Sequence, residues 1–160
     1  MMPLDLLSNN FWFYQSVTNM RASVKHNFKE NISFTIGTSL ERTGIYFDLL
    51  KEGKKVRNDY WNWLPFGNVN KNWKEKLSIT LAYRRTINRP GLNELNPTID
   101  FSDAYNVRFG NPNLVAATSH NFDLIFGRTK PKYFLNVGMG YNVVQDVISS
   151  VRTLLDLGKT

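Results

Sequence analysis

Few side chains in this chain combine the residue types and the spacing that catalysis or metal binding requires. The two histidines, His26 and His120, lie far apart, and neither has a further ligand at the short spacing typical of zinc sites. Glu41 and Asp123 are single carboxylates on the polar faces of expected strands, so they do not form an acid–base pair. The chain contains no Cys, which excludes a thiolate metal site and a disulfide framework. We therefore expect no catalytic residue, metal or cofactor, and no enzyme.

Two nearby glycines also fail to indicate a ligand site. Gly138 and Gly140 lie two residues apart inside a strand-like segment, and no helical pattern follows them. A phosphate-binding loop needs its glycines between a strand and a helix. Bending of the strand, or the close approach of another backbone, is the better interpretation.

The most distinctive segment is the polar stretch from Tyr83 to Leu114, which is rich in Pro, Gly and Asn and separates two alternating segments. Loops longer than roughly 12–15 residues are uncommon in compact soluble domains. A connection of this length indicates either a function of its own or an unusual architecture.

Composition favours an all-β protein and argues against several functions. Of the 160 residues 42% are hydrophobic and 14% aromatic, and aromatic residues favour strands. The net charge of +7 comes from scattered basic residues, so we do not expect nucleic-acid binding. Residues 1–10 lack the features of a signal peptide, and no apolar run is long enough for a membrane helix of roughly 18 residues. A helical membrane protein is excluded, whereas a β-barrel is not.

Alternating polar and apolar residues predict about six strands, each close to the roughly 9–11 residues of a tilted membrane-spanning strand. In the clearest example, Ile32, Phe34, Ile36 and Leu40 share one face and Ser33, Thr35 and Ser39 the other. Three segments alternate strongly and three more weakly: 31–41, 77–87 and 133–143, then 18–26, 64–71 and 119–127.

The expected connections alternate strictly between short and long. Short turns are expected at 27–30, 72–76 and 128–132, and long loops at 43–60, at 88–117 and from about residue 146. An antiparallel meander would place every short turn at one end of the sheet and every long loop at the other. This asymmetry is typical of outer-membrane barrels. Alternation by itself would equally fit a soluble half-buried sheet.

Aromatic residues cluster near both ends of the expected strands, as they do in the two aromatic girdles of membrane barrels. Those expected at the long-loop end are Phe11, Trp12, Phe13, Tyr14, Tyr60, Trp61 and Trp63, and those at the short-turn end are Phe28, Trp73 and Tyr133. Together with the sorted loops, they favour a transmembrane β-barrel.

Residues 85–97, RTINRPGLNELNP, and residues 110–114, GNPNL, resemble the barrel region of Bacteroidetes-type TonB-dependent outer-membrane receptors. In that family a strand ends in a similar Arg-Pro pattern, continues through Leu-Asn-Pro and reaches Gly-Asn-Pro-Asn-Leu. Weaker similarity extends over nearly the whole chain, although Val115, Ala116 and Ala117 replace the usual Lys-Pro-Glu and Ser39 replaces an Arg. The residues in register are Tyr83, Arg85, Ile87, Asn88, Arg89, Pro90, Leu95, Asn96, Pro97, Asp103, Gly110, Asn111, Pro112, Asn113 and Leu114.

The residues of this motif are interpreted as structural. Pro fixes φ and removes a donor, while Gly and Asn permit tight turns, so the motif ends a strand and stiffens a loop. Arg84, Arg85 and Arg89 could pair with carboxylates of a domain inside the barrel, or be solvated at its mouth. Glu41 and Asp123 are further candidates for contacts in the lumen or at the mouth.

The resemblance implies that residues 1–160 form three hairpins of a larger barrel and lack the plug domain. Its partners would be outer-membrane lipid, the remainder of the barrel and its plug, the TonB complex acting through that plug, and a small nutrient ligand. The implied function is energised import of a metal chelate or an oligosaccharide, and the ligand itself stays open. The alternative is a soluble all-β module whose exposed tryptophans bind carbohydrate or nucleic acid.

Overall fold

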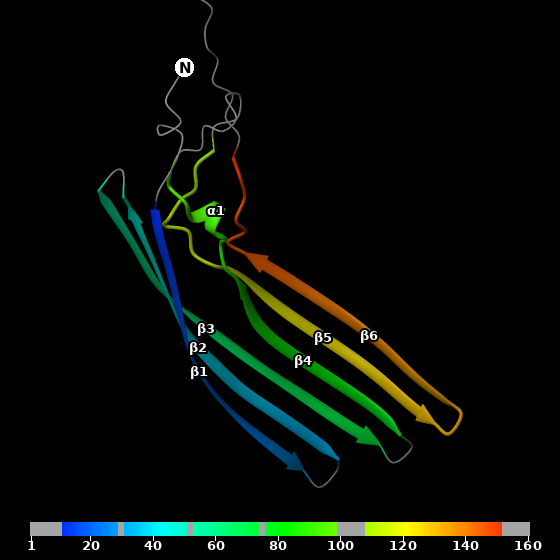
Figure 1. Cartoon of the computed structure of the whole chain (residues 1–160). Coiled ribbons are helices and arrows are strands. Elements are labelled where there is room, and N and C mark those ends of the chain that lie inside the picture. Colours follow the sequence, from blue (N-terminus) through cyan, green and yellow to red (C-terminus); the bar gives the residue numbers. More distant parts are fainter. Residues whose placement is uncertain (1–10, 29–30, 51–52, 74–75, 99–107, 152–160) are drawn as a thin grey trace, which may run out of the picture.

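The computed structural model describes residues 11–28, 31–50, 53–73, 76–98 and 108–151. The strands within them form one sheet in the order β1-β2-β3-β4-β5-β6, and neighbouring strands are antiparallel. The expected all-β meander is therefore confirmed. The elements are β1 (Phe11–Phe28), β2 (Ile32–Leu49), β3 (Lys54–Trp73), β4 (Leu77–Asn88), α1 (Leu92–Leu95), β5 (Ala117–Lys130) and β6 (Tyr133–Gln145), as Figure 1 shows.

The strand ends that flank the three short turns lie together at one end of the sheet, opposite α1 (Figure 1). Asn31 and Lys76 close two of these turns with positive φ angles of 56° and 58°. Asn adopts this left-handed conformation more readily than most residues. No helix among the described residues is long and apolar enough to cross a membrane.

The expected long loop at 43–60 is wrong. Strand β2 continues to Leu49 and β3 begins at Lys54, so most of this segment is a paired hairpin. Alternation persists through it, but the apolar residues change face: Leu40 lies on one face, whereas Ile45 and Phe47 lie on the other. The prediction assumed that the apolar residues of a strand stay on one face, and by that rule the strand would end at Glu41. The backbone in fact stays extended to Leu49.

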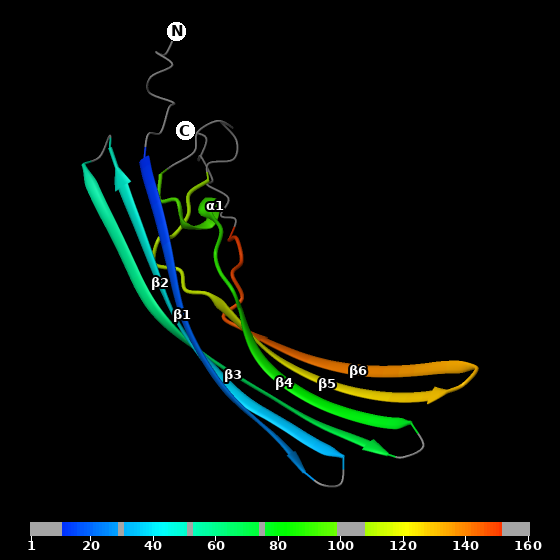
Figure 2. The same ribbon diagram turned by 60° about the horizontal axis from the view of Figure 1, so that its bottom comes forward.

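The sheet is curved, and α1 lies on its concave side (Figure 2). We call the face that carries Glu41 and Phe47 the inner face, because the segment between β4 and β5 packs against it. The opposite side, which carries Leu40 and Trp63, is the outer face. In the half of the sheet nearest the short turns, the inner face is mainly polar and the outer face mainly apolar, as the cross-strand partners Asn70–Thr80 and Val69–Leu81 illustrate.

The hydrophobic core lies in the opposite half, where the polarity of the two faces is reversed. Ile45, Phe47 and Leu49 are at most 2% exposed and pack with Leu95 of α1 on the inner face. Phe11, Phe13, Val56, Tyr60 and Leu114 surround this cluster. The expectation that Phe11, Phe13 and Tyr60 belong to an aromatic girdle is therefore wrong, because these rings face the core.

Strand β3 pairs with β2 along its whole length but with β4 only from Phe66 to Trp73. Pairing stops beside Pro65, and Pro cannot donate a ladder hydrogen bond. Beyond this point β1, β2 and β3 form a three-stranded extension beside the segment that joins β4 to β5 (Figure 2).

Candidate functional site on the inner face

The segment that carries the sequence motif, here called the motif loop, consists of the described residues 89–98 and 108–116. Its first half forms α1, a single helical turn. The Glu94 side chain accepts a hydrogen bond from the Gly91 N–H at 2.7 Å, and Leu95 N–H donates to the Gly91 carbonyl at 3.1 Å. These bonds satisfy amide groups that a helix start leaves free. The turn points Leu95, which is fully buried, at Phe47 and its neighbours.

The two halves of the motif bind each other through their backbones. Gly110 N–H donates to the Asn96 carbonyl and Asn111 N–H donates to the Glu94 carbonyl, both at 2.7 Å. A Cβ on Gly110 would overlap the Glu94 carbonyl oxygen, so this close approach requires glycine. The motif residues thus stabilise one compact loop.

Asparagine side chains hold the turns of the motif loop. Asn96 Oδ1 accepts hydrogen bonds from the Thr98 amide at 3.1 Å and from its hydroxyl at 2.7 Å. Asn111 Oδ1 accepts from Asn113 N–H at 3.0 Å. Such bonds from Asn to the backbone two residues onward are typical of tight turns.

We expect Gly110→Ala to loosen the motif loop. The added methyl group must displace the Glu94 backbone, which typically costs about 1–3 kcal/mol. Amide exchange at Asn111, whose N–H donates to Glu94, should become faster. Gly91→Ala is the matched control, because a Cβ there meets only the flexible Glu94 side chain, at 3.8 Å. Equal exchange rates in the two variants would contradict this account.

Polar contacts join the motif loop to the inner face. The Asn58 side chain on β3 donates to the carbonyl oxygens of Pro112 and Leu114, both at 3.1 Å. Arg89 forms an ion pair with Glu41 on β2, and the Glu41 side chain is only 6% exposed. A buried carboxylate needs such a partner, since an unpaired buried charge is costly. The pair ties the start of the loop to the middle of the sheet.

Closer to the short turns, the inner face carries exposed polar side chains. Arg84 and Asp123 lie on neighbouring strands with 4.0 Å between Nη2 and Oδ2. Asn142 donates to Asn121 at 2.6 Å, and Asn121 donates to the Thr86 hydroxyl at 3.1 Å. We call this hydrophilic part of the inner face the polar wall.

An aromatic ring interrupts the polar wall where β1, β2 and β3 adjoin. The Arg21 guanidinium carbon lies 4.1 Å from the centre of the Phe66 ring, a cation–π contact. The ring lies against Gly37, where a Cβ would overlap it. The missing side chain at Gly37 therefore makes room for Phe66, and Phe66 presents its ring to Arg21.

The structure brings most of the predicted motif residues together. Arg89, Pro90, Leu95, Asn96, Pro97 and Gly110–Leu114 form the motif loop, and Glu41 pairs with it. Arg84 and Asp123 form a separate pair, and Asn88 pairs with Ala117 at the end of β4. Arg85 lies on the outer face opposite His120, so the contact expected between Arg85 and a domain inside the barrel is wrong. Asp103 lies outside the described residues.

Sequence reasoning missed the surface that receives the loop. Ile45, Phe47, Leu49 and Asn58 fell within the supposed loop 43–60. The available signal was the alternation of Ile45, Phe47 and Leu49 with polar residues, in the opposite phase to Ile36 and Leu40. Among the described residues, no group of three or more His, Cys, Asp or Glu side chains could hold a metal ion.

The model of the outer membrane protein beta-barrel family matches residues 2–158, which is nearly the whole chain. The chain belongs to this family. Membership places this barrel chain in the bacterial outer membrane and removes the soluble binding module from consideration. No match was found among curated proteins.

The outer face of this barrel-family chain is the side in contact with lipid. Its apolar band includes Leu81, Leu124, Val137 and Met139, all exposed in the isolated sheet. Outward-facing aromatic residues toward the long-loop end include Trp61, Trp63, Tyr83, Phe122 and Tyr141, with Trp12 and Tyr14 further along on the three-stranded extension, and those near the short turns include Phe28, Trp73 and Tyr133. Such rings occupy the membrane–water interfaces of barrels.

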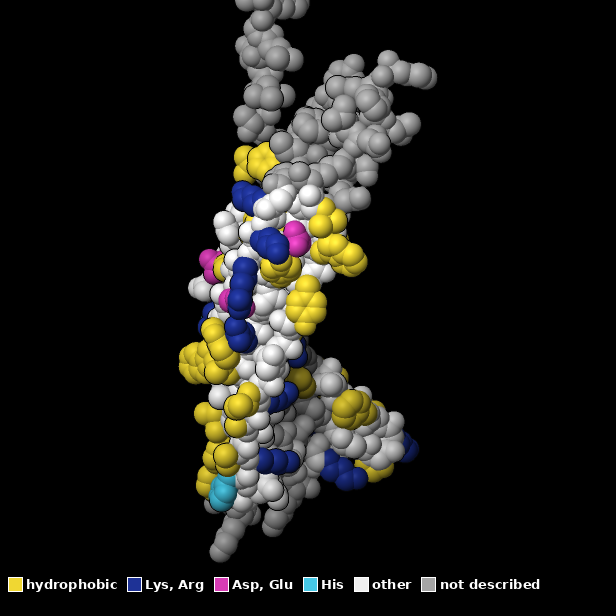
Figure 3. Space-filling model, turned by 60° about the vertical axis from the view of Figure 1, so that its left-hand side comes forward, with side chains coloured by type: hydrophobic (Ala, Val, Ile, Leu, Met, Phe, Trp, Pro, Cys, Tyr) yellow, Lys and Arg dark blue, Asp and Glu magenta, His cyan; other side chains and the backbone are white. Residues whose placement is uncertain are grey.

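Beyond Trp61 and Trp63, toward the long-loop end, the outer face of the three-stranded extension carries charged side chains. Arg42 and Arg57 both pair with Asp59, and Lys55 lies 3.8 Å from Asp48. Hydrogen bonding from Arg57 lowers the pKa of Asp59 below its ordinary value. Figure 3 shows hydrophobic side chains along one side of the lower half, with basic and acidic side chains gathered above. The apolar band therefore ends near Trp61.

We expect Leu81→Lys to destabilise the barrel in its membrane by about 2–4 kcal/mol, as charges on the lipid face of barrels do near the bilayer midplane. Leu81 faces outward on β4, and its neighbour Thr80 faces the polar inner wall. Thr80→Lys is therefore the matched control and should cost much less. Urea unfolding of both variants in lipid vesicles measures the difference. A similar loss in both would contradict the assignment of the two faces.

Proposed function

We propose that this chain forms part of the wall and mouth of a TonB-dependent receptor that imports a scarce nutrient, such as a metal chelate or an oligosaccharide. The proposal is supported by the resemblance of residues 85–97 and 110–114 to that receptor group, within a chain of the outer membrane barrel family. The observation that carries it is the packing of the motif loop on the inner face beside the polar wall. There the loop would frame the entrance to a water-filled lumen.

The charges on the inner face suit an anionic ligand, or the carboxylates of a plug. The two acidic side chains that the described strands place on this face, Glu41 and Asp123, each pair with an arginine. Among the described residues, Arg21 and Lys25 on β1 have no carboxylate partner, and both lie on the inner face. The polar wall therefore keeps an excess of positive charge.

We further propose that additional strands complete the barrel around this sheet. Within the described part of the chain, β1 and β6 each pair on one side only. In lipid, each unsatisfied backbone group costs several kcal/mol, so both edges need partners. The remaining strands, the plug and the TonB-contacting segment would come from the rest of the receptor. Sequence coding for a plug and for further alternating strands is then expected beside these residues in the genome, and its absence would contradict this proposal.

Uptake measurements test the import function. Cells that lack the receptor should lose growth on one iron chelate or one oligosaccharide supplied at low concentration, and cells that lack TonB should show the same loss. Restoring the receptor should restore growth only when TonB is present. Uptake that depends on the receptor but persists without TonB would instead indicate a passive pore.

A further inference from the structure

The outer face has a groove of about 550 Å³ where β1, β2 and β3 adjoin, within the size range of small-molecule pockets. It exists because the outward-facing side chains are small along one row across three strands. Ala22 lies opposite Thr38, and Thr38 lies opposite Pro65. The next row toward the long-loop end carries the larger side chains of Met20, Leu40 and Trp63.

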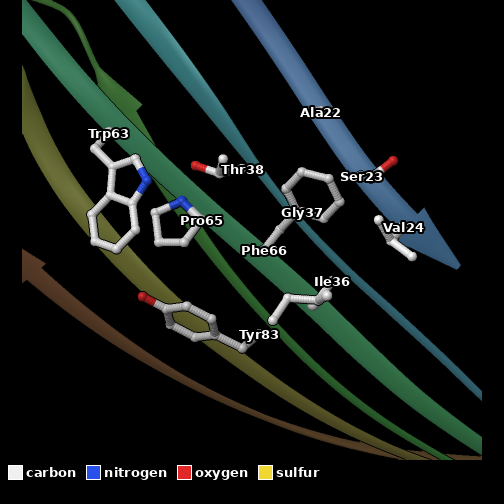
Figure 4. Close-up of a pocket in the computed structure, with 11 residues that line it drawn as sticks. Ala22, Ser23, Val24, Ile36, Gly37, Thr38, Trp63, Pro65, Phe66 and Tyr83 are labelled. Atoms are coloured by element: carbon white, nitrogen blue, oxygen red, sulfur yellow. The ribbon is translucent and has the colours of Figure 1, made fainter.

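Apolar side chains surround the small residues of the groove. Trp63 and Pro65 lie on one side of it, Ile36 and Val24 on another, and Tyr83 closes the β4 side, as Figure 4 shows. The groove runs across the strands, so strands tilted at about 45° would place it obliquely in the membrane. Because it lies in the lipid-facing apolar band, its natural occupant is a hydrocarbon chain.

A cationic group lies on the long-loop side of the groove, beyond the row of Met20, Leu40 and Trp63. Arg42 is on the same face of β2 as Thr38, four residues further along, which corresponds to about 13 Å. Its guanidinium carbon lies 6.0 Å from the Trp61 ring, at the end of the apolar band, and its side chain is 47% exposed. Arg42 and Arg57 share the single carboxylate of Asp59, so the cluster keeps one positive charge. The long-loop end of an outer-membrane barrel faces the cell exterior, so a side chain where the apolar band ends on this side is level with the headgroups of the outer leaflet.

We propose that this groove holds an acyl chain of a phosphorylated lipid of the outer leaflet, and that the lipid phosphate contacts Arg42. The acyl chain fills the row Ala22–Thr38–Pro65, and Trp63 packs along it. The positive charge at Arg42 selects phosphorylated lipid over uncharged lipid. This lipid site is independent of the proposed import function.

Tryptophan quenching tests the proposal on the whole outer-membrane protein in phosphatidylcholine vesicles. The added probe is brominated lipid A, with its phosphates or without them. Because Trp63 lines the groove, the phosphorylated probe should quench its fluorescence at lower concentration. Trp63→Phe separates the Trp63 signal from the signals of the other tryptophans. Thr38→Leu and Ala22→Leu each fill the groove and should abolish this quenching, whereas Val137→Leu, on the same face of β6, should not.

The charge is tested separately. Arg42→Gln should weaken the preference for phosphorylated lipid A about tenfold, as expected for loss of one charge-assisted hydrogen bond. Lys55→Gln, beyond the tryptophans on the same face, should leave the preference unchanged. Equal quenching by both probes in the unmodified protein would overturn the phosphate contact. If the filling variants change the oligomeric state and leave the quenching intact, the groove is a protein interface and the proposal is wrong.

Discussion

Leu95→Ala is expected to release the motif loop from the inner face. Leu95 is fully buried against Ile45, Phe47 and Leu49, so its truncation removes apolar contacts and leaves a cavity. Such changes typically cost about 2–5 kcal/mol. Because the loop is only a part of the sheet, the loss should appear first as local opening. Hydrogen exchange at the Gly110 and Asn111 amides, both bonded within the loop, measures this opening.

Leu92→Ala is the matched control for this experiment. Leu92 lies in the same helical turn and carries the same side chain, but it is 41% exposed. The two substitutions have equal effects on helix propensity and differ in burial. Exchange that is unchanged by Leu95→Ala, or accelerated equally by both substitutions, would show that the loop does not depend on its apolar contact with β2.

Arg89→Met is expected to destabilise the same docking by about 3 kcal/mol. It leaves the Glu41 carboxylate, 6% exposed, without its charged partner. This is the lower end of the range for a broken buried pair, because the Arg89 side chain is one-third exposed. Exchange of the loop amides and urea unfolding in detergent measure the loss.

Two further variants separate the charge effect from lost packing. Removing both charges, with Arg89→Met and Glu41→Gln together, should be less harmful than Arg89→Met alone, because no charge is then buried without a partner. Arg84→Met breaks the exposed pair with Asp123 and should cost about 0–1 kcal/mol. A double variant as unstable as the single one would show that Arg89 acts through packing alone.

The sheet topology was predictable because its signals are local. The period-two alternation at 31–41, 77–87 and 133–143, and the turn residues between strands, depend on neighbours in sequence. The boundaries of the connection between β4 and β5 were also predicted, since Asn88 and Ala117 are where the pairing of β4 with β5 ends. Proline and glycine end the strands and favour turns in this segment through local backbone effects, which do not depend on the surrounding fold.

The length of β2 and β3 was not predictable in the same way. Whether an apolar residue belongs to the inner or outer face depends on what covers that face, and this changes along β2. From the short turn to Leu40, the apolar residues of β2 lie on the outer, lipid-facing side. Beyond Thr43, they lie on the inner face and pack against the motif loop. The phase of the apolar residues therefore inverts without any break in the strand.

The sequence by itself determined the meander, the three short turns at one end of the sheet and the motif that marks its longest described connection. Only the tertiary structure decided what this connection contacts. Arg89 reaches Glu41 across 48 residues and Asn58 reaches Leu114 across 56, so these contacts exist only once the sheet has formed. Alternation and turn chemistry act over a few residues, whereas burial and ion pairing depend on which distant segments the folded sheet brings together.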